Sequence, residues 1–268
     1  MFKDITLGQY FPGDTVVHKL DPRTKLILTV LFIIALFVAK DAVSYGFMIL
    51  ILVTVIILSK TKPAMLFKGI KPLFIILIIT GLLNVLYTPG EHVIAEFWIF
   101  TVTLEGIKTA ILMILRIIML VMGTSILTYT TSPIDLTDGL EMLLNPLKKL
   151  KIPVHEMSMM MSIALRFIPT IIEETDKIMS AQKARGADFE TGNLVVRAKA
   201  MLPILVPLFI SAFRRADELA IAMESRCYHG GDGRTRMKVL KYAGRDVVAF
   251  ISGFAVLAAV IAMRKLGI

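Results

Sequence analysis

Two arginines, Arg185 and Arg226, are the side chains of this sequence best suited to binding a partner protein. Each ends a helix-like segment in which an aspartate stands nine positions, and an alanine four positions, before the arginine. A planar guanidinium donates hydrogen bonds in a fixed fork, which suits carboxylates and carbonyls of another chain. The helix dipole also favours arginine at a carboxyl end, so the residues alone leave docking and local capping equally open. The segments, 41 residues apart, comprise Asp176, Ala181 and Arg185, and Asp217, Ala222 and Arg226.

Helical geometry separates the aspartate from the arginine in each segment. Nine residues advance an α-helix by about 900°, so the two side chains lie on opposite sides and form no ion pair within the helix. The alanine lies one turn before the arginine on the same face. Each arginine is therefore expected to project from a face of small residues at a helix end.

No catalytic or metal-ligating pattern accompanies these arginines. The four histidines are scattered, and one cysteine cannot complete a zinc site. The glycine-rich run 229–233 lacks the Gly-Lys-Ser/Thr of a nucleotide-binding loop, and no serine lies in a nucleophile elbow. The acids at 173–176 splay around a helix and are interpreted as a solvated face. We therefore expect no cofactor, no metal and no ATP hydrolysis by this chain itself.

The elements that position the arginines belong to a membrane protein. Of the 268 residues, 56% are hydrophobic and only 19% are charged, and the mean hydropathy is +0.75. A helix of roughly 20 apolar residues spans a bilayer. Four runs of 17 to 19 residues and one of 14 lack any charge, which predicts an all-α integral membrane protein with about five transmembrane helices. These runs are 26–39, 42–59, 72–90, 117–134 and 247–263.

The distribution of charge predicts the orientation of the chain. Lysine and arginine in the first 25 residues, and four lysines without an acid in 60–71, indicate cytoplasmic segments. The acidic stretch 87–106 is predicted to lie outside. The basic net charge of +9 is explained by topology and anionic lipid rather than by nucleic acid. We therefore expect a multi-pass protein of the cell membrane with a cytoplasmic amino terminus.

The predicted organisation has three parts. Residues 1–130 hold four membrane helices, 131–245 form a cytoplasmic region, and 246–268 form the last membrane helix. The cytoplasmic region is predicted to contain three helices, the first beginning at Ser132-Pro133 and ending or kinking at Pro146.

The second and third cytoplasmic helices are predicted over 154–187, bent at Pro169, and over 198–228. The second begins with a methionine-rich stretch, and methionine suits both core filling and an apolar surface that repacks against changing partners. The third begins with an apolar stretch, 201–213, judged too short to span a membrane. The candidate partner-contact residues on these stretches are Met157, Met160, Met161, Leu205 and Phe209.

Two further groups of polar residues lie at the start of the first membrane helix and within a span. Asp21 is predicted to cap a helix beginning at Pro22, with Arg23 and Lys25 facing the lipid headgroups. Arg116 lies inside the apolar region, and an intramembrane arginine is a functional candidate unless packed protein surrounds it.

Seven short segments spread along the chain share a likeness to one family: 20–26, 131–133, 153–156, 164–170, 181–186, 215–220 and 222–226. Together they resemble the transmembrane (T) component of energy-coupling factor (ECF) transporters. The resemblance implies an L-shaped, all-helical protein whose coupling helices bind two ABC-type ATPases and a substrate-binding S component. It implies that ATPase docking belongs to Ala184, Arg185 and Gly186 and to Ser225, Arg226 and Cys227, although the second triplet lacks the family's usual flanking residues.

The expected function is the coupling subunit of an ATP-driven importer of vitamins or other micronutrients. The resemblance assigns substrate choice to the S component, so this sequence does not name the substrate. The alternatives are a secondary transporter or channel that acts alone and, less favoured because no paired catalytic residues exist, a membrane-embedded enzyme.

Overall fold

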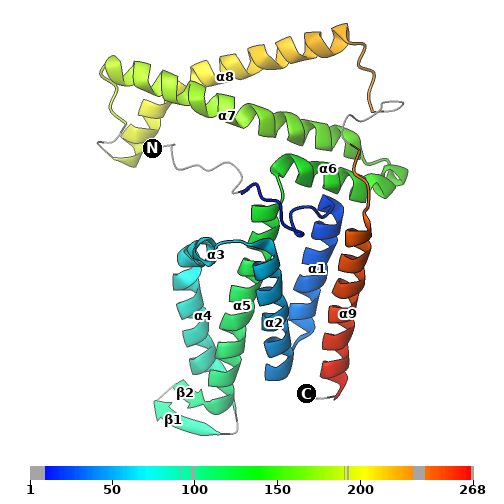
Figure 1. The fold of residues 1–268 in the computed structure, drawn as a ribbon. Coiled ribbons are helices and arrows are strands. Elements are labelled where there is room, and N and C mark those ends of the chain that lie inside the picture. Colours follow the sequence, from blue (N-terminus) through cyan, green and yellow to red (C-terminus); the bar gives the residue numbers. More distant parts are fainter. Residues whose placement is uncertain are drawn as a thin grey trace. The chain divides into compact units, whose positions relative to one another are not determined.

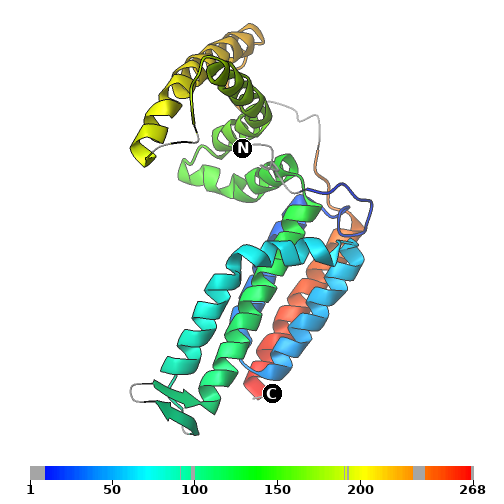
Figure 2. The same cartoon turned by 90° about the vertical axis from the view of Figure 1, so that its left-hand side faces the viewer.

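A computed structural model describes residues 10–90, 92–97, 100–189, 191, 193–231 and 239–266. These residues are mostly helical, as the sequence predicts, and form two compact units (Figures 1 and 2). The bundle unit lies within residues 8–143 and 239–268, and the arm unit within 144–238.

The bundle unit is built from helices that run side by side (Figure 1). Helices α1 and α9 pack along each other, and so do α4 and α5. Figure 2 shows the short helix α3 running across the ends of its neighbours. The helices are α1 (Pro22–Val38), α2 (Ala42–Ser59), α3 (Pro63–Ile70), α4 (Phe74–Tyr87), α5 (Leu104–Thr130), α6 (Pro133–Leu144) and α9 (Gly244–Leu266). A short 3-10 turn, η1 (Lys71–Leu73), joins α3 to α4, and an antiparallel hairpin, β1 (Val93–Phe97) and β2 (Phe100–Thr103), joins α4 to α5.

The core of the bundle lies where α1, α2, α5 and α9 meet. Leu36, Tyr45, Met48, Met119 and Val260 are at most 1% exposed. Glycines allow the helices to approach closely: a side chain at Gly253 of α9 would overlap Leu28 of α1, and one at Gly123 of α5 would overlap Phe32. Small residues commonly allow such contacts between membrane helices, where packing takes over from the hydrophobic effect.

Among the described residues, five helical segments are long and apolar enough to cross a membrane, but they are not the same five that the charge-free runs predict. Helix α1, with 17 residues, is not one of them. Helix α8 is one of them, because it begins at Leu194, four residues earlier than predicted, and its apolar segment 195–225 extends well beyond the predicted stretch 201–213. Helix α5 begins at Leu104 rather than near 117, because charged residues continue the helix instead of ending it. The candidates are 42–59, 63–87, 104–130, 195–225 and 244–266.

Arg116 is bound inside the bundle by groups of the protein. Its Nε donates to the hydroxyl of Tyr45 at 2.7 Å, and its Nη2 donates to the carbonyl of Ala39 at 3.1 Å. Ala39 is the C-cap of α1, so Arg116 satisfies one of the carbonyls that a helix end leaves without a partner. The sequence left two explanations for Arg116, a functional role or contact with packed protein. Its hydrogen bonds support the second.

The arm unit consists of two long helices, α7 (Val154–Ala184) and α8 (Leu194–Ser225), preceded by the 3-10 segment η2 (Asn145–Leu150). Helix α6 ends at Leu144, just before Pro146, as predicted. Pro169 lies inside α7, and Pro203 and Pro207 lie inside α8, so none of these prolines ends its helix. Helices α7 and α8 pack against each other and cross, with their carboxyl ends on opposite sides of the crossing (Figure 1).

Candidate docking site

Both long helices of the arm unit end in the same hydrogen-bonded turn. At the end of α7, the amides of Gly186 and Ala187 donate to the carbonyls of Lys183 and Gln182. This pattern is the Schellman motif, in which one residue after the helix adopts a left-handed backbone conformation. Gly186 fills that position with φ +87°, and Arg185 is the C-cap before it.

Helix α8 repeats the motif 41 residues later without a glycine. The amides of Cys227 and Tyr228 donate to the carbonyls of Glu224 and Met223, and Arg226 is the C-cap. Cys227 takes the left-handed position with φ 55°. The hydrogen-bonded turn is therefore the same in both copies, and the second copy carries the backbone strain of a non-glycine residue in the left-handed region.

Substitutions at positions 186 and 227, the left-handed residues of the two turns, should have opposite effects on the stability of the fold. We expect Cys227→Gly to stabilise the fold by about 1 kcal/mol, because glycine adopts the left-handed region without the steric cost of a side chain. Gly186→Ala should destabilise it by a similar amount, and nothing lies within 4 Å of the added methyl group, so the cost is one of backbone alone. Thermal unfolding in detergent measures both variants. A loss of stability in Cys227→Gly would show that the thiol makes a stabilising contact.

The two arginines are open to solvent. Arg185 and Arg226 are exposed, as are Ala181 and Ala222 one turn earlier. Within the part of the chain that the structure describes, neither guanidinium makes a hydrogen bond or an ion pair. Ala184, Gly186, Ser225 and Cys227 are also exposed, so both predicted triplets are accessible to a partner.

An ion pair joins the two helices at equivalent positions of the repeat. Nη2 of Arg215 lies 2.7 Å from Oε2 of Glu174, and each residue stands two positions before the aspartate of its own copy. A hydrogen bond from Ser211, aided by the charge of Arg215, lowers the pKa of Glu174. The arginine ends therefore lie eleven residues, or about 16 Å, beyond this pair on both helices.

Helix α8 buries one narrow face and exposes most of its other apolar side chains. Ile204 is buried, and Leu208 and Arg215 are half-buried on the same face. Leu205 and Phe209 point elsewhere and are 45% and 62% exposed. The methionines predicted at the start of α7, Met157, Met160 and Met161, are likewise exposed, so packing within the arm unit does not explain them.

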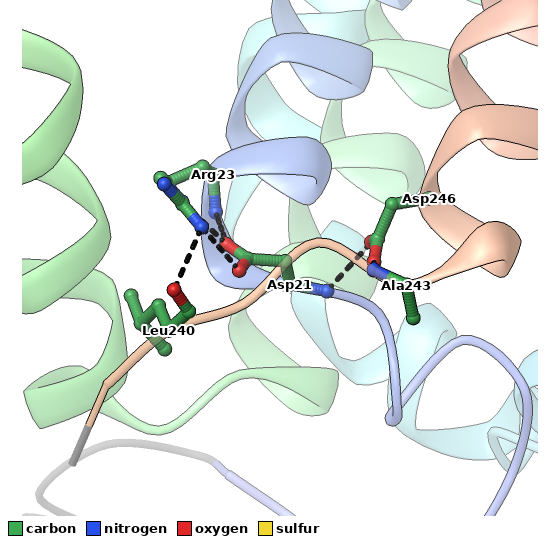
Figure 3. A network of polar contacts seen from close by, with 5 residues as sticks. All are labelled: Asp21, Arg23, Leu240, Ala243 and Asp246. Carbon is green, nitrogen blue, oxygen red and sulfur yellow. Dashed lines mark hydrogen bonds and ion pairs between the residues drawn. The ribbon is translucent and has the colours of Figure 1, made fainter.

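A second polar cluster, absent from the predicted site, lies at the first turn of α1 (Figure 3). Asp21 caps α1 as predicted, accepting from the amide of Arg23 at 2.9 Å. The prediction that Arg23 and Lys25 face headgroups is wrong. The guanidinium of Arg23 bonds both carboxylate oxygens of Asp21 and reaches the carbonyl of Leu240, and Lys25 is only 6% exposed.

Asp246 completes this cluster from the start of α9. Its carboxylate accepts the amide of Asp21 at 2.9 Å and the amide of Ala243 at 2.8 Å, and it is 1% exposed. Burial alone would raise the pKa of Asp21, but the hydrogen bonds from Arg23 outweigh it and hold that pKa below its ordinary value. No sequence signal links two residues that lie 225 positions apart.

The sequence matches the family model of CbiQ, described as cobalt transport protein, over residues 13–238. It is 55% identical over 250 residues to the energy-coupling factor transporter transmembrane protein EcfT of Clostridium kluyveri, covering 93% of both chains. The EcfT proteins of Bacillus subtilis and Lactococcus lactis subsp. cremoris are 48% and 43% identical, over 94% and 93% of this chain and 95% and 94% of theirs.

The chain belongs to the EcfT family. It is therefore a multi-pass, all-α membrane protein of an energy-coupling factor transporter, the assignment that its motifs predicted. Its relatives are named as transmembrane proteins of an energy-coupling factor transporter.

Proposed function

We propose that this chain is the coupling subunit of an ATP-driven importer, with Arg185 and Arg226 docking onto two ABC-type ATPases. The observation that carries the proposal is the pair of helix ends with the same Schellman turn, each presenting an exposed arginine above a face of small residues. Local capping would explain each arginine separately, but it gives no reason for the same end to occur twice. Two equivalent ends on crossing helices suit a partner that itself has two equivalent sites.

The proposed mechanism converts ATPase motion into motion of the arms. The ATPases close when they bind ATP and reopen after hydrolysis, and the docked helix ends move with them. Helices α7 and α8 are continuous over tens of ångströms, at 1.5 Å per residue, so in this proposal they carry that displacement along their length. The arm unit and the amino terminus lie on the cytoplasmic side of the cell membrane in this proposal, as the lysine-rich segments favour.

The exposed apolar side chains of the arms are proposed to contact the substrate-binding S component. Leu205 and Phe209 on α8, with Met157, Met160 and Met161 on α7, offer an apolar surface that adapts to differently shaped partners. The S component selects the substrate, a vitamin or another micronutrient, so a change of S component changes the substrate without a change in this chain.

A charge on this surface should release the S component and leave the ATPases bound. We expect the double variant Leu205→Asp, Phe209→Asp to lose at least about tenfold of the co-purifying S component, because each carboxylate would be desolvated at an apolar interface. Val196→Asp, an equally exposed apolar position in the first turn of α8, is the matched control. Retention of the S component by the double variant would place the contact elsewhere.

Co-purification from the native membrane tests the proposed function as a whole. The tagged chain is purified in a gentle detergent, and mass spectrometry identifies the proteins that elute with it. Two ABC-type ATPases and one or more small hydrophobic proteins are expected. A chain that elutes alone, and transports substrate into vesicles without any ATPase, would instead be a stand-alone transporter or channel.

A further inference from the structure

The first turn of α1 touches both segments through which the chain leaves and re-enters the bundle unit. The chain passes from α5 into α6 and leaves the bundle unit at the end of α6, where it continues into the arm unit. It re-enters along residues 239–243, which form an extended strap ahead of α9. We call residues 21–25 the junction turn.

On the side where the chain leaves, the junction turn holds α5 and α6. Lys25 Nζ donates to the carbonyl of Thr130, the last residue of α5, at 2.8 Å and to the carbonyl of His18 at 3.1 Å. Gly139 of α6 packs on the same turn so closely that an added methyl group would lie 3.0 Å from Cβ of Pro22. The ammonium and the glycine therefore fix the corner between α5 and α6 against α1.

On the side where the chain re-enters, the same turn holds the strap (Figure 3). Arg23 Nη2 donates to the carbonyl of Leu240 at 3.3 Å, and its guanidinium carbon lies 3.9 Å above the centre of the Tyr242 ring. Asp21 orients the guanidinium through Nε and Nη2, and Asp246 binds the amides of Asp21 and Ala243. A guanidinium held in this bidentate way is fixed in orientation as well as in position.

Helix capping alone does not account for this arrangement. A cap on α1 needs only the bond from Asp21 to the amide of Arg23. The contacts of Arg23 with Leu240 and Tyr242 stabilise neither helix internally, because both residues lie in the strap. They fix where the strap runs, and with it the point from which the arm unit is tethered.

We propose that the junction turn anchors both connections of the arm unit, and that Arg23 is a positioning residue for coupling. This inference rests on the proposed function. Displacement of the docked arms is resisted at one turn of α1, so the bundle stays still while the arms move. When Arg23 no longer contacts Leu240 and Tyr242, the strap itself moves during part of each displacement of the arms. ATP is then hydrolysed without transport.

The test compares two arginines that tie opposite ends of α1. Arg116, like Arg23, donates to a backbone carbonyl and contacts a tyrosine, but it lies at the end of α1 away from the strap. Arg23→Gln and Arg116→Gln are purified as whole complexes and reconstituted into vesicles. Co-purifying subunits, thermal stability, ATP hydrolysis and substrate uptake are measured on the same preparations. Arg23→Gln should keep its ATPases and lower uptake per ATP by about 3- to 30-fold, whereas Arg116→Gln should leave that ratio unchanged.

A second pair of variants separates positioning from stability. Tyr242 is 52% exposed, so its truncation removes little buried surface. Tyr242→Phe keeps the aromatic ring under Arg23 and should keep the wild-type ratio of uptake to hydrolysis. Tyr242→Ala should lower that ratio while the thermal midpoint stays near that of the wild type.

Each outcome decides one claim. Loss of coupling in Arg23→Gln and Tyr242→Ala, with recovery in Tyr242→Phe, supports the junction turn as a positioning element. Equal ratios in all variants, or losses that follow thermal stability in Arg23→Gln and Arg116→Gln alike, overturn it. A wild-type chain that carries no ATPase would overturn the proposed function instead, independently of these variants.

Discussion

Replacing both Arg185 and Arg226 by alanine should separate the chain from its ATPases and abolish uptake. Both side chains are exposed at helix ends, so truncation leaves the fold intact and removes the cationic fork that a partner would bind. Arginines at the centre of an interface are frequent hot spots, and each is expected to contribute about 2–4 kcal/mol, or roughly 30- to 1,000-fold in affinity. The single variants should keep a weakened, partly assembled complex, because the second end still docks.

The helices themselves supply the control for this experiment. Arg166 on α7 and Arg214 on α8 are exposed arginines away from the helix ends. The double variant Arg166→Ala, Arg214→Ala removes the same charge and should keep both ATPases. Co-purification and uptake are measured for both double variants. Parental uptake in Arg185→Ala, Arg226→Ala would leave these arginines with a capping role only.

Asp246→Ala should cause the largest loss of stability among single substitutions in the bundle unit. The buried carboxylate accepts hydrogen bonds from two backbone amides and lies beside Arg23 and Lys25. In the variant, these two cations would no longer have the negative charge of Asp246 beside them. Leaving these groups without an acceptor should cost about 3 kcal/mol and lower the thermal midpoint by about 6–12 °C. Thermal unfolding of the purified complex in detergent measures the change.

Asp41 provides a matched aspartate for that measurement. It is the N-cap of α2, but its side chain makes no capping hydrogen bond, so Asp41→Ala should change stability by at most about 0.5 kcal/mol. A small effect of Asp246→Ala, comparable to that of Asp41→Ala, would mean that water readily replaces the carboxylate at the first turn of α1.

Local signals predicted the elements that carry the candidate site. Asp21 before Pro22 and Ser132 before Pro133 mark helix starts that the structure confirms, because a cap and a proline act within one turn. The spacing of Asp, Ala and Arg located the two helix ends that carry the arginines, and the structure adds that Cys227 takes the position of glycine in the second turn. Backbone hydrogen bonds impose the turn there, even though the residue is unfavourable.

Features that depend on distant parts of the chain were not predictable. A lysine beside an apolar run usually extends toward water, which is why the sequence predicts Lys25 at the headgroups. The carbonyls that bind it belong to residues 18 and 130, and no local pattern brings them together. The start of α5 differs from the charge-free run for a related reason: Arg116 can lie within the helix because its acceptors are on the C-cap of α1 and on α2.

The pairing of Glu174 with Arg215 has a consequence for how force would be shared between two partners. The pair lies eleven residues from the arginine on each helix, so both proposed docking ends stand at the same distance from it. We expect equal displacements of the two ends to change mainly the angle at which the helices cross, and unequal displacements to move the ion pair as well. One extra helical turn in either helix would make the two distances unequal, so we expect these distances to be constrained together rather than separately.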